Sequence, residues 1–252
     1  MGGLNCVKDE DPNDFQSNGD PHGTHVAGLV GANGPMKGTA PSVNLMSYRV
    51  FAKDGSGATN FAILKAVAHA VENGCDFLNM SLGVDGDDPA LAEAITHARN
   101  EGSLVLAAGN NSHGGDVGSP SNYADCIGIS AVGRTDVLPV NAQAQQDITA
   151  SRGTSPDTFF AAFSCIGNSL NITGPGVGVV STVPGGYGQL SGTSMACPTI
   201  TGFAAQLLAS NPTLMKADRT RKRSDEMAKI LMENAQNLGL PADQQGRGLP
   251  FT

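Results

Sequence analysis

The chain has 252 residues, of which 40% are hydrophobic, and a formal net charge of −8 at pH 7. This length and apolar content suit a single domain, residues 1–252, with one large core, and the acidity argues against nucleic acid as a partner. No apolar run approaches the roughly 18 residues of a transmembrane helix, so no membrane partner is expected, and the polar residues 1–19 contain no signal-peptide h-region.

Short apolar runs alternate with amphipathic stretches along the chain. In chain order, the pattern predicts a strand at 43–50, a helix at 60–72, a strand at 75–82, a helix at 89–100, strands at 103–107 and 126–132, and helices at 193–210 and 224–238. Helices that alternate with short buried strands indicate βαβ units. We therefore expect an α/β fold with three layers, αβα, around a mainly parallel central sheet.

Three of the predicted helices carry more specific expectations. The apolar helix at 193–210 is expected at the centre of the fold, and the amphipathic helix at 224–238 on its surface. The helix at 60–72 is expected to end at Gly74 and to bury one apolar stripe, formed by Phe61, Leu64, Ala68 and Val71.

Polar and basic segments between these elements are predicted to be loops. Residues 111–125 and 137–156 lack a clear period, and the second segment is rich in Gln, Ala and Thr, so it is interpreted as an insertion loop. The basic run Arg219–Arg223 is interpreted as a solvated loop, with a proteolytic processing site as the alternative.

The cysteines are widely spaced and include no CxxC pair, which argues against a cysteine-based zinc site. Most are expected to be small buried residues, while one or two disulfides remain an open alternative. The residues concerned are Cys6, Cys75, Cys126, Cys165 and Cys197.

Three short motifs point to nucleophilic catalysis. Residues 192–198, Gly-Thr-Ser-Met-Ala-Cys-Pro, place Ser194 after a glycine turn at a helix start, where the helix dipole and backbone N–H groups suit a nucleophile whose attack creates an oxyanion. Residues 22–28, His-Gly-Thr-His-Val-Ala-Gly, offer His22 as a base. Residues 107–110 end a predicted parallel strand with Asn110, and the carboxyl ends of such strands gather catalytic groups. The Asn110 carboxamide there can donate a hydrogen bond into a cleft.

In this order, the motifs resemble those of the subtilisin-like serine proteases, the subtilases. Residues 22–28 resemble their catalytic-histidine motif, residues 192–196 their catalytic-serine motif, and Asn110 falls at their oxyanion asparagine. The resemblance implies that Ser194 attacks the scissile carbonyl, that His22 transfers the proton, and that the Ser194 N–H and Asn110 hold the oxyanion. It runs from His22 to Leu249 and includes the further segments 38–41, 54–57, 79–83 and 246–249.

The resemblance also implies a protein or peptide substrate that binds as an extended strand between two segments of the enzyme. Family members are mostly secreted, which favours an extracellular location, although intracellular members exist. No cofactor is required. The loop at 29–37 is shorter than in calcium-binding members, so calcium is not expected there and is left open elsewhere. The residues expected to contact substrate are Gly55, Ser56, Gly57, Ser81, Leu82, Gly83, Ala108, Gly109 and Thr193.

One part of the family pattern is missing from this sequence. The resemblance implies a catalytic aspartate at the end of a buried central strand, and the residues before His22 include no apolar strand that ends in Asp. Asp20 and the other carboxylates nearby are interpreted as solvated loop residues. Three explanations stay open: residues 1–252 are N-terminally incomplete; another chain, an N-terminal segment or a pro-segment supplies the strand; or the protein is an inactive relative that binds extended peptides.

A weaker alternative is a metal-dependent hydrolase that uses His22 and His25 as ligands. Their spacing of three lets them share one helix face, but the sequence has no HExxH glutamate between them and no evident third ligand. We expect His25 instead to be packed or hydrogen-bonded near the site.

Overall fold

The computed structural model describes residues 2–16, 19–83, 86–138 and 143–250. Its helices are α1 (His22–Gly31), α2 (Asn60–Glu72), α3 (Pro89–Asn100), α4 (Thr193–Ala209), α5 (Pro212–Met215), α6 (Arg221–Glu233) and α7 (Ala242–Gln245). Its strands are β1 (Gly2–Asn5), β2 (Met46–Arg49), β3 (Phe77–Met80), β4 (Leu104–Ala108), β5 (Cys126–Arg134), β6 (Ile148–Arg152), β7 (Thr158–Ala161), β8 (Leu170–Pro175), β9 (Val179–Val183) and β10 (Gly186–Leu190). Among the described residues, no helix has the length and apolar character needed to cross a bilayer.

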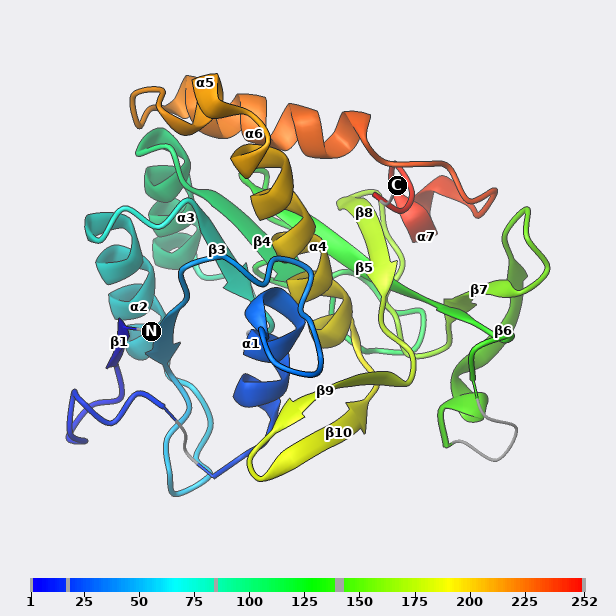
Figure 1. Ribbon diagram of the computed structural model, residues 1–252, viewed down its shortest axis with the longest axis horizontal. Coiled ribbons are helices and arrows are strands. Elements are labelled where there is room, and N and C mark those ends of the chain that lie inside the picture. The colour runs from blue at the N-terminus through cyan, green and yellow to red at the C-terminus, as the bar shows by residue number, and fades with distance from the viewer. Residues whose placement is uncertain (1, 17–18, 84–85, 139–142, 251–252) are drawn as a thin grey trace.

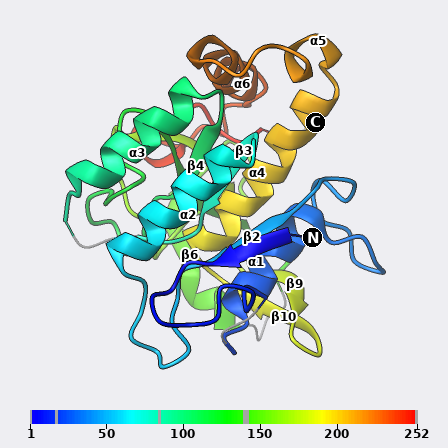
Figure 2. The same ribbon diagram turned by 90° about the vertical axis from the view of Figure 1, so that its left-hand side faces the viewer.

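A central sheet with the strand order β3-β4-β5-β7-β6 organises the fold, and β8 pairs with β5 beside this path. Strands β3, β4, β5 and β8 are parallel, whereas β7 runs antiparallel to β5 and β6 runs antiparallel to β7. Helices α2 and α3 pack on one face and helices α4 and α6 on the other (Figures 1 and 2). The expected three-layer αβα class with a mainly parallel sheet is confirmed.

The residues of β4 show how the sheet is buried on both faces. Leu104 and Leu106 pack into one core with α4, whereas Val105 and Ala107 pack into a second core with α2 and α3. All residues of β4 are therefore buried. Continuous apolar strands of this kind are typical of parallel sheets that are covered by helices on both sides.

Strand β2 does not join this sheet. It pairs in parallel with β1, in a register that runs from Gly2 opposite Met46 to Asn5 opposite Arg49. Within the described residues no strand lies between β2 and β3, and β1 ends at an asparagine rather than at an aspartate. In the part of the chain that the structure describes, β2 and β3 therefore belong to separate sheets, and each has one edge without a partner strand.

Two predicted helices, α2 and α3, have the predicted bounds, and α4 is central as expected. The predicted strands are confirmed with shifts of a few residues at their ends. The buried stripe of α2 is different from the prediction, because Phe61 is 61% exposed. The predicted stripe and the buried stripe are rotated about the helix axis by about 100° relative to each other. Both stripes are apolar, so hydrophobicity alone does not show which of them is buried. The buried residues are Ala62, Ile63, Val67 and Ala70.

The basic run at 219–223 is not a solvated loop. Residues from Arg221 onward form the first turn of α6, and the Arg223 side chain is only 3% exposed. Its guanidinium donates to Asp76 Oδ1 at 2.7 Å, to the Gly102 carbonyl at 2.9 Å and to the Leu214 carbonyl at 3.2 Å. The run therefore fastens α6 to the amino ends of β3 and β4, a tertiary role that composition does not reveal.

Replacing Arg223 by alanine is expected to lower the free energy of unfolding by about 3 kcal/mol, because two carbonyls and a carboxylate lose a charged donor. Chemical denaturation measures the change. The neighbouring Lys222 is exposed and serves as the control, since K222A should leave the free energy of unfolding within about 0.5 kcal/mol of the parent value. Equal effects of the two substitutions would contradict the fastening role.

Two other expectations need correction or completion. The segment 137–156, predicted as an insertion loop, contains a 3₁₀ helix at Gln143–Asp147 and strand β6, because β6 pairs with β7; residues 139–142 lie outside the described part. The segment 111–125 has no helix or strand, as predicted.

All five cysteines are free and all but Cys75 are buried, so the disulfide alternative does not hold in this structure.

Candidate active site

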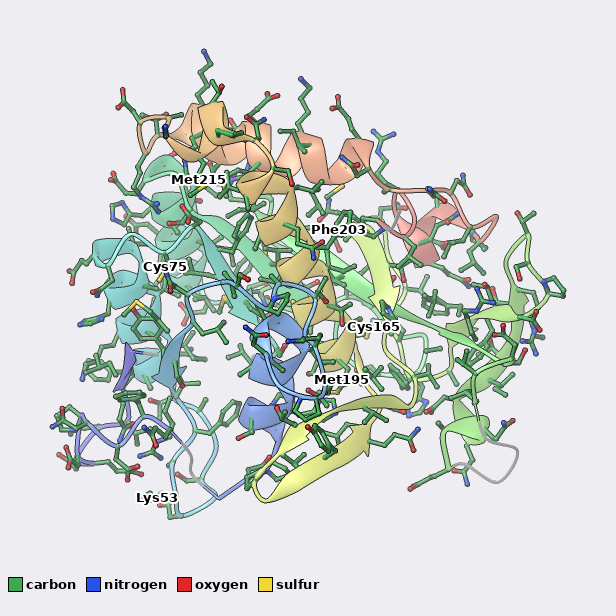
Figure 3. All side chains as sticks on the ribbon, viewed as in Figure 1. Lys53, Cys75, Cys165, Met195, Phe203 and Met215 are labelled. Atoms are coloured by element: carbon green, nitrogen blue, oxygen red, sulfur yellow. The ribbon has the colours of Figure 1, made fainter. Side chains whose placement is uncertain are left out.

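The candidate site lies where the ends of β3 and β4 meet the first turn of α4. Ser81 follows β3, Asn110 follows β4, and Ser194 is the second residue of α4. The Ser194 Oγ donates to the Ser81 carbonyl at 3.4 Å, and the Ser81 Oγ donates to the Ser194 carbonyl at 2.9 Å. This first turn, marked by Met195 in Figure 3, lies beside α1 and next to the β9–β10 hairpin. Three elements far apart in sequence therefore converge around Ser194.

The backbone ahead of Ser194 is fixed by its neighbours. Gly192 has a φ of +154°, a value that residues with side chains rarely adopt. Thr193 is fully buried, and both its backbone N–H and its hydroxyl donate to Asn111 Oδ1 at 2.9 Å. The residue after Asn110 thus holds the turn that presents Ser194, while Ser194 itself is half-buried and accessible.

The Asn110 carboxamide is confined between two glycines. Asn110 has a φ of +71°, in the left-handed region that asparagine tolerates better than most residues. A Cβ atom at Gly83 would lie 2.5 Å from Asn110 Oδ1, and a Cβ atom at Gly118 would lie 2.3 Å from Asn110 Nδ2. Side chains at these positions would displace the carboxamide, so the two glycines help to set its direction.

His22 is the first residue of α1, and its ring is half-buried. Its backbone N–H donates to Asp20 Oδ1 at 2.7 Å. This hydrogen bond of the carboxylate is therefore to the first N–H of α1 and not to the imidazole ring. Burial lowers the pKa of His22 below its ordinary value, and the negative charge of Asp20 raises it in part. The net shift favours the neutral imidazole, which is the form that accepts a proton.

His25 has a structural environment, as expected. It is fully buried, and its Nε2 lies 3.0 Å from the Val179 carbonyl on β9. The hairpin contacts α1 further, because Ser181 Oγ donates to the His25 carbonyl at 2.7 Å and Thr182 Oγ1 donates to the Thr24 carbonyl at 3.0 Å. His25 thus ties α1 to the β9–β10 hairpin.

Replacing Asp20 by asparagine is expected to move the acid limb of activity to lower pH. Asparagine keeps the oxygen that caps α1 but removes the charge that raises the pKa of His22. Because activity falls as His22 gains a proton, a lower pKa extends activity into more acid solution. The pH dependence of kcat/KM measures the shift. The exposed Asp218 provides the control D218N, and a shift toward higher pH in D20N would contradict the assignment.

The segments expected to contact substrate lie in two places. Gly55–Gly57 form an exposed turn in which the Ser56 N–H donates to Asp54 Oδ1 at 2.9 Å, and Gly55 and Gly57 have φ values of +78° and +88°. This turn lines one cavity together with His22, Ser81 and Leu82. At the end of β4, the Gly109 N–H donates to the Ile129 carbonyl at 2.8 Å, and a Cβ atom on Gly109 would lie 2.9 Å from that oxygen.

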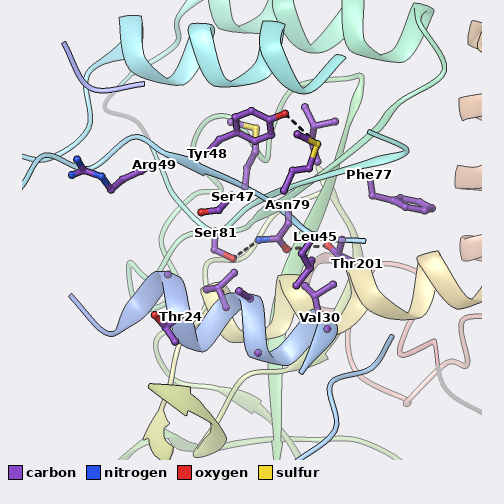
Figure 4. Close-up of a pocket in the computed structure, with 18 of the residues that line it drawn as sticks. Thr24, Val30, Leu45, Ser47, Tyr48, Arg49, Phe77, Asn79, Ser81 and Thr201 are labelled. Atoms are coloured by element: carbon purple, nitrogen blue, oxygen red, sulfur yellow. Dashed lines mark hydrogen bonds between the residues drawn. The ribbon is translucent and has the colours of Figure 1, made fainter. Parts of the chain in front are cut away.

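Sequence reasoning missed residues that support Ser194 from behind. Thr201 Oγ1 donates to Asn79 Oδ1 at 2.9 Å, and Asn79 Nδ2 donates to Ser81 Oγ at 2.9 Å (Figure 4). The Ser81 Oγ donates in turn to the Ser194 carbonyl. Asn111 supports Thr193 in the same way. Thr201 and Asn79, and likewise Ser81 and Ser194, lie more than a hundred residues apart, and Asn111 lies 82 residues from Thr193, so no local pattern indicates these contacts.

The loop after α1 is closed by contacts between its own residues. An antiparallel bridge pairs Asn33 with Lys37, and the Lys37 ammonium donates to Asn33 Oδ1. A positive group therefore takes up a side-chain oxygen that a hard cation would need.

Comparison with known proteins gives the family. The sequence profile described as "Subtilase family" matches residues 4–248. The chain belongs to the subtilase family. It is 36% identical over 257 residues to subtilisin DY of Bacillus licheniformis, an alignment that covers 99% of this chain and 81% of that protein. Alkaline elastase YaB of Bacillus sp. (strain YaB) is 38% identical over 216 residues, which are 84% of this chain and 50% of that protein.

The fold comparison agrees with the sequence comparison. The structure of sphericase superposes with a TM-score of 0.78 at 25% sequence identity, and the superposition covers 99% of this chain and 84% of that one. This subtilase is accordingly a hydrolase of the subtilisin-like serine protease class. The chain spans about half the length of alkaline elastase YaB and most of the length of subtilisin DY.

Proposed function

We propose that this subtilase domain is a serine endopeptidase in which Ser194 is the nucleophile and His22 the general base. The observation that carries the proposal is the convergence of Ser194, Ser81 and the Asn110 segment at the amino end of α4. A serine held there lies at the positive end of a long helix, and the Asn110 carboxamide, next in sequence to the Asn111 that holds Thr193, is confined by its neighbours.

In the proposed reaction, the Ser194 Oγ forms a bond to the scissile carbonyl carbon while its proton passes to the His22 ring. The carbonyl electron pair moves onto oxygen, which accepts hydrogen bonds from the Ser194 N–H and the Asn110 carboxamide. Collapse of this intermediate breaks the C–N bond, and His22 returns the proton to the leaving amine. Water then releases the acyl group by the same steps. These residues supply proton transfer and charge stabilisation without a cofactor.

The substrate is proposed to be a protein or peptide that binds as an extended strand. One side of it would pair with Gly55–Gly57 and the other with Ser81–Gly83, in agreement with the cavity that Gly55, Gly57, Ser81 and Leu82 line together. Ala108, Gly109 and Thr193 would form the floor next to the nucleophile. Because Gly109 has no side chain and Ala108 has only a methyl group, this floor would leave room for the substrate's own side chain.

A second candidate function follows from one observation about His22. Among the described residues, no carboxylate accepts a hydrogen bond from its ring, and Asp20 caps α1 instead. A subtilase that lacks such a carboxylate loses about 10⁴ in kcat, a magnitude measured on trypsin and a subtilisin. The alternative is a domain that binds extended peptides with little or no turnover.

A fluorophosphonate probe distinguishes the two functions. The enzyme proposal predicts a covalent adduct on Ser194 of the folded protein after long exposure, located by peptide mass spectrometry, and no adduct in S194A. The exposed Ser155 supplies the control S155A, which should be labelled like the parent. A folded, peptide-binding sample that stays unlabelled at Ser194 would instead support the binding module.

A further inference from the structure

Two loops lie side by side at the lower left of Figures 1 and 2: residues 6–14 after β1, and residues 51–58 after β2. The second loop, here called the substrate turn, contains Gly55 and Gly57, which are expected to contact substrate. An antiparallel bridge between Phe51 and Ala58 closes its base. Both glycines have positive φ values, and glycine has more conformational freedom than any other residue. The turn therefore needs support from outside itself to keep one conformation.

Glu10 of the first loop reaches the substrate turn. Its Oε1 accepts a hydrogen bond from the Lys53 backbone N–H at 3.1 Å, and its Oε2 accepts one from the Arg49 guanidinium. Asn5 Nδ2 also donates to Oε2, at 3.4 Å. The Lys53 N–H, followed by the Arg49 guanidinium, holds the pKa of the Glu10 carboxyl below its ordinary value. The charged carboxylate thus connects the end of β2 to the substrate turn.

Arg49, the last residue of β2, makes this connection a strong one. Its side chain is only 5% exposed. The guanidinium donates through Nε to the Asp14 carbonyl at 2.8 Å and through Nη1 to the Phe51 carbonyl at 3.1 Å. One buried cation therefore holds the first loop, the Glu10 carboxylate and the start of the substrate turn together. Without the carboxylate, its charge would be buried and uncompensated, which is costly.

A second ion pair joins the same two loops but contributes less. The Lys53 ammonium contacts the Asp14 carboxylate, and these side chains are 54% and 36% exposed. Exposed pairs of this kind are screened by water and salt and contribute little to stability. The constraint on the substrate turn therefore passes mainly through Glu10, by way of the buried Arg49 and the Lys53 backbone N–H, rather than through the Lys53 ammonium.

We propose that Glu10 is a positioning residue for the substrate: it holds the substrate turn in the conformation that binds an extended peptide. This proposal rests on the proposed function, because it takes residues 55–57 as one side of the peptide groove. Glu10 acts through Arg49 and Lys53 and touches no substrate. Its effect is therefore on the affinity for peptides that are long enough to reach the substrate turn, and not on acyl transfer at Ser194.

A purely structural role of Glu10 predicts a different result. Loss of stability lowers the amount of folded protein, so it affects the hydrolysis of short and long substrates alike. A positioning role raises KM only for substrates that reach the substrate turn and leaves kcat unchanged, because the lost interaction is the same in the ground state and the transition state. Substrate length therefore separates the two roles.

The test compares two nitrophenyl esters, of N-acetylalanine and of a blocked alanine tetrapeptide, which spans roughly 13 Å when extended. In E10A, KM for the long ester should rise about tenfold, the effect of losing one charge-assisted hydrogen bond, with kcat unchanged. Both constants for the short ester should stay as in the parent. E10Q keeps an oxygen for the Lys53 N–H but loses the charge, so its KM should lie between those of the parent and E10A.

Two controls complete the design. D9N removes the same charge from an exposed position of the same loop, where asparagine tolerates the φ of +64°, and R223A lowers stability far from the substrate turn. Neither should change KM for the long ester.

An unchanged KM in folded E10A, an equal rise for the short ester, or an equal rise in either control would overturn the positioning role. Hydrogen exchange gives a readout that needs no activity: the Lys53 amide and the amides of the substrate turn should exchange at least about tenfold faster in E10A than in D9N. Equal exchange would also contradict the proposal. Faster exchange in a protein that hydrolyses neither ester would keep the support by Glu10 and contradict the proposed function.

Discussion

Replacing Ser194 by alanine is expected to abolish acyl transfer. If another polypeptide segment supplies a carboxylate that orients His22, the S194A substitution should lower kcat by about 10⁶, the loss known for a subtilisin without its nucleophile. In residues 1–252 alone, where that carboxylate is missing among the described residues, the fall should be about 10², because the larger part of the rate is already absent. Hydrolysis of a chromogenic peptide measures both values.

The double variant S194A/H22A provides the control for joint action. If Ser194 and His22 act as one unit, the double variant should be no slower than S194A alone. Multiplied losses would mean that the two residues contribute independently. Melting temperatures of both variants should stay near that of the parent, because neither side chain belongs to the core.

Replacing Asn110 by alanine is expected to lower kcat by about 10²–10³ with little change in KM, since the carboxamide would act only on the charge that develops in the transition state; the magnitude comes from a subtilisin. Steady-state kinetics with a peptide substrate separates the two constants. The exposed Asn100 at the end of α3 gives the control N100A, for which neither constant should change.

Gly118→Ala tests the same carboxamide without removing it. The new Cβ atom would lie 2.3 Å from Asn110 Nδ2 and should push the carboxamide out of line, so kcat should fall while the fold is kept. Gly186 has open space around it and gives the matched control G186A. A normal kcat in G118A combined with a low kcat in N110A would mean that the carboxamide tolerates the displacement.

Sequence patterns predicted much of this fold because its central strands and helices have strong local signals. The bounds of α2 and α3 follow from the hydrophobic period, and in the structure Thr59 and Asp88 accept hydrogen bonds from the first turns of these helices. The α4 start follows from its glycine turn. Ser194, His22 and Asn110 were predicted from motifs, and the structure places Ser194 and the Asn110 segment at one edge of the sheet.

The features that the sequence did not predict depend on tertiary contacts. Arg223 is buried because Asp76, Gly102 and Leu214 offer oxygens from three other segments. Strand β6 forms because β7 provides an edge for it. The network from Thr201 to the Ser194 carbonyl likewise joins α4 to β3. No window of the sequence contains both partners of such contacts, so local propensity carries no information about them.

Acid quench of the protein during hydrolysis of an activated peptide ester, followed by mass spectrometry, tests the central claim most directly. If Ser194 forms an acyl-enzyme with His22 as base, the acyl group should be found on Ser194, should decay with turnover and should be absent from S194A. Turnover with no acyl group on Ser194, or with the acyl group on another residue, would contradict the account.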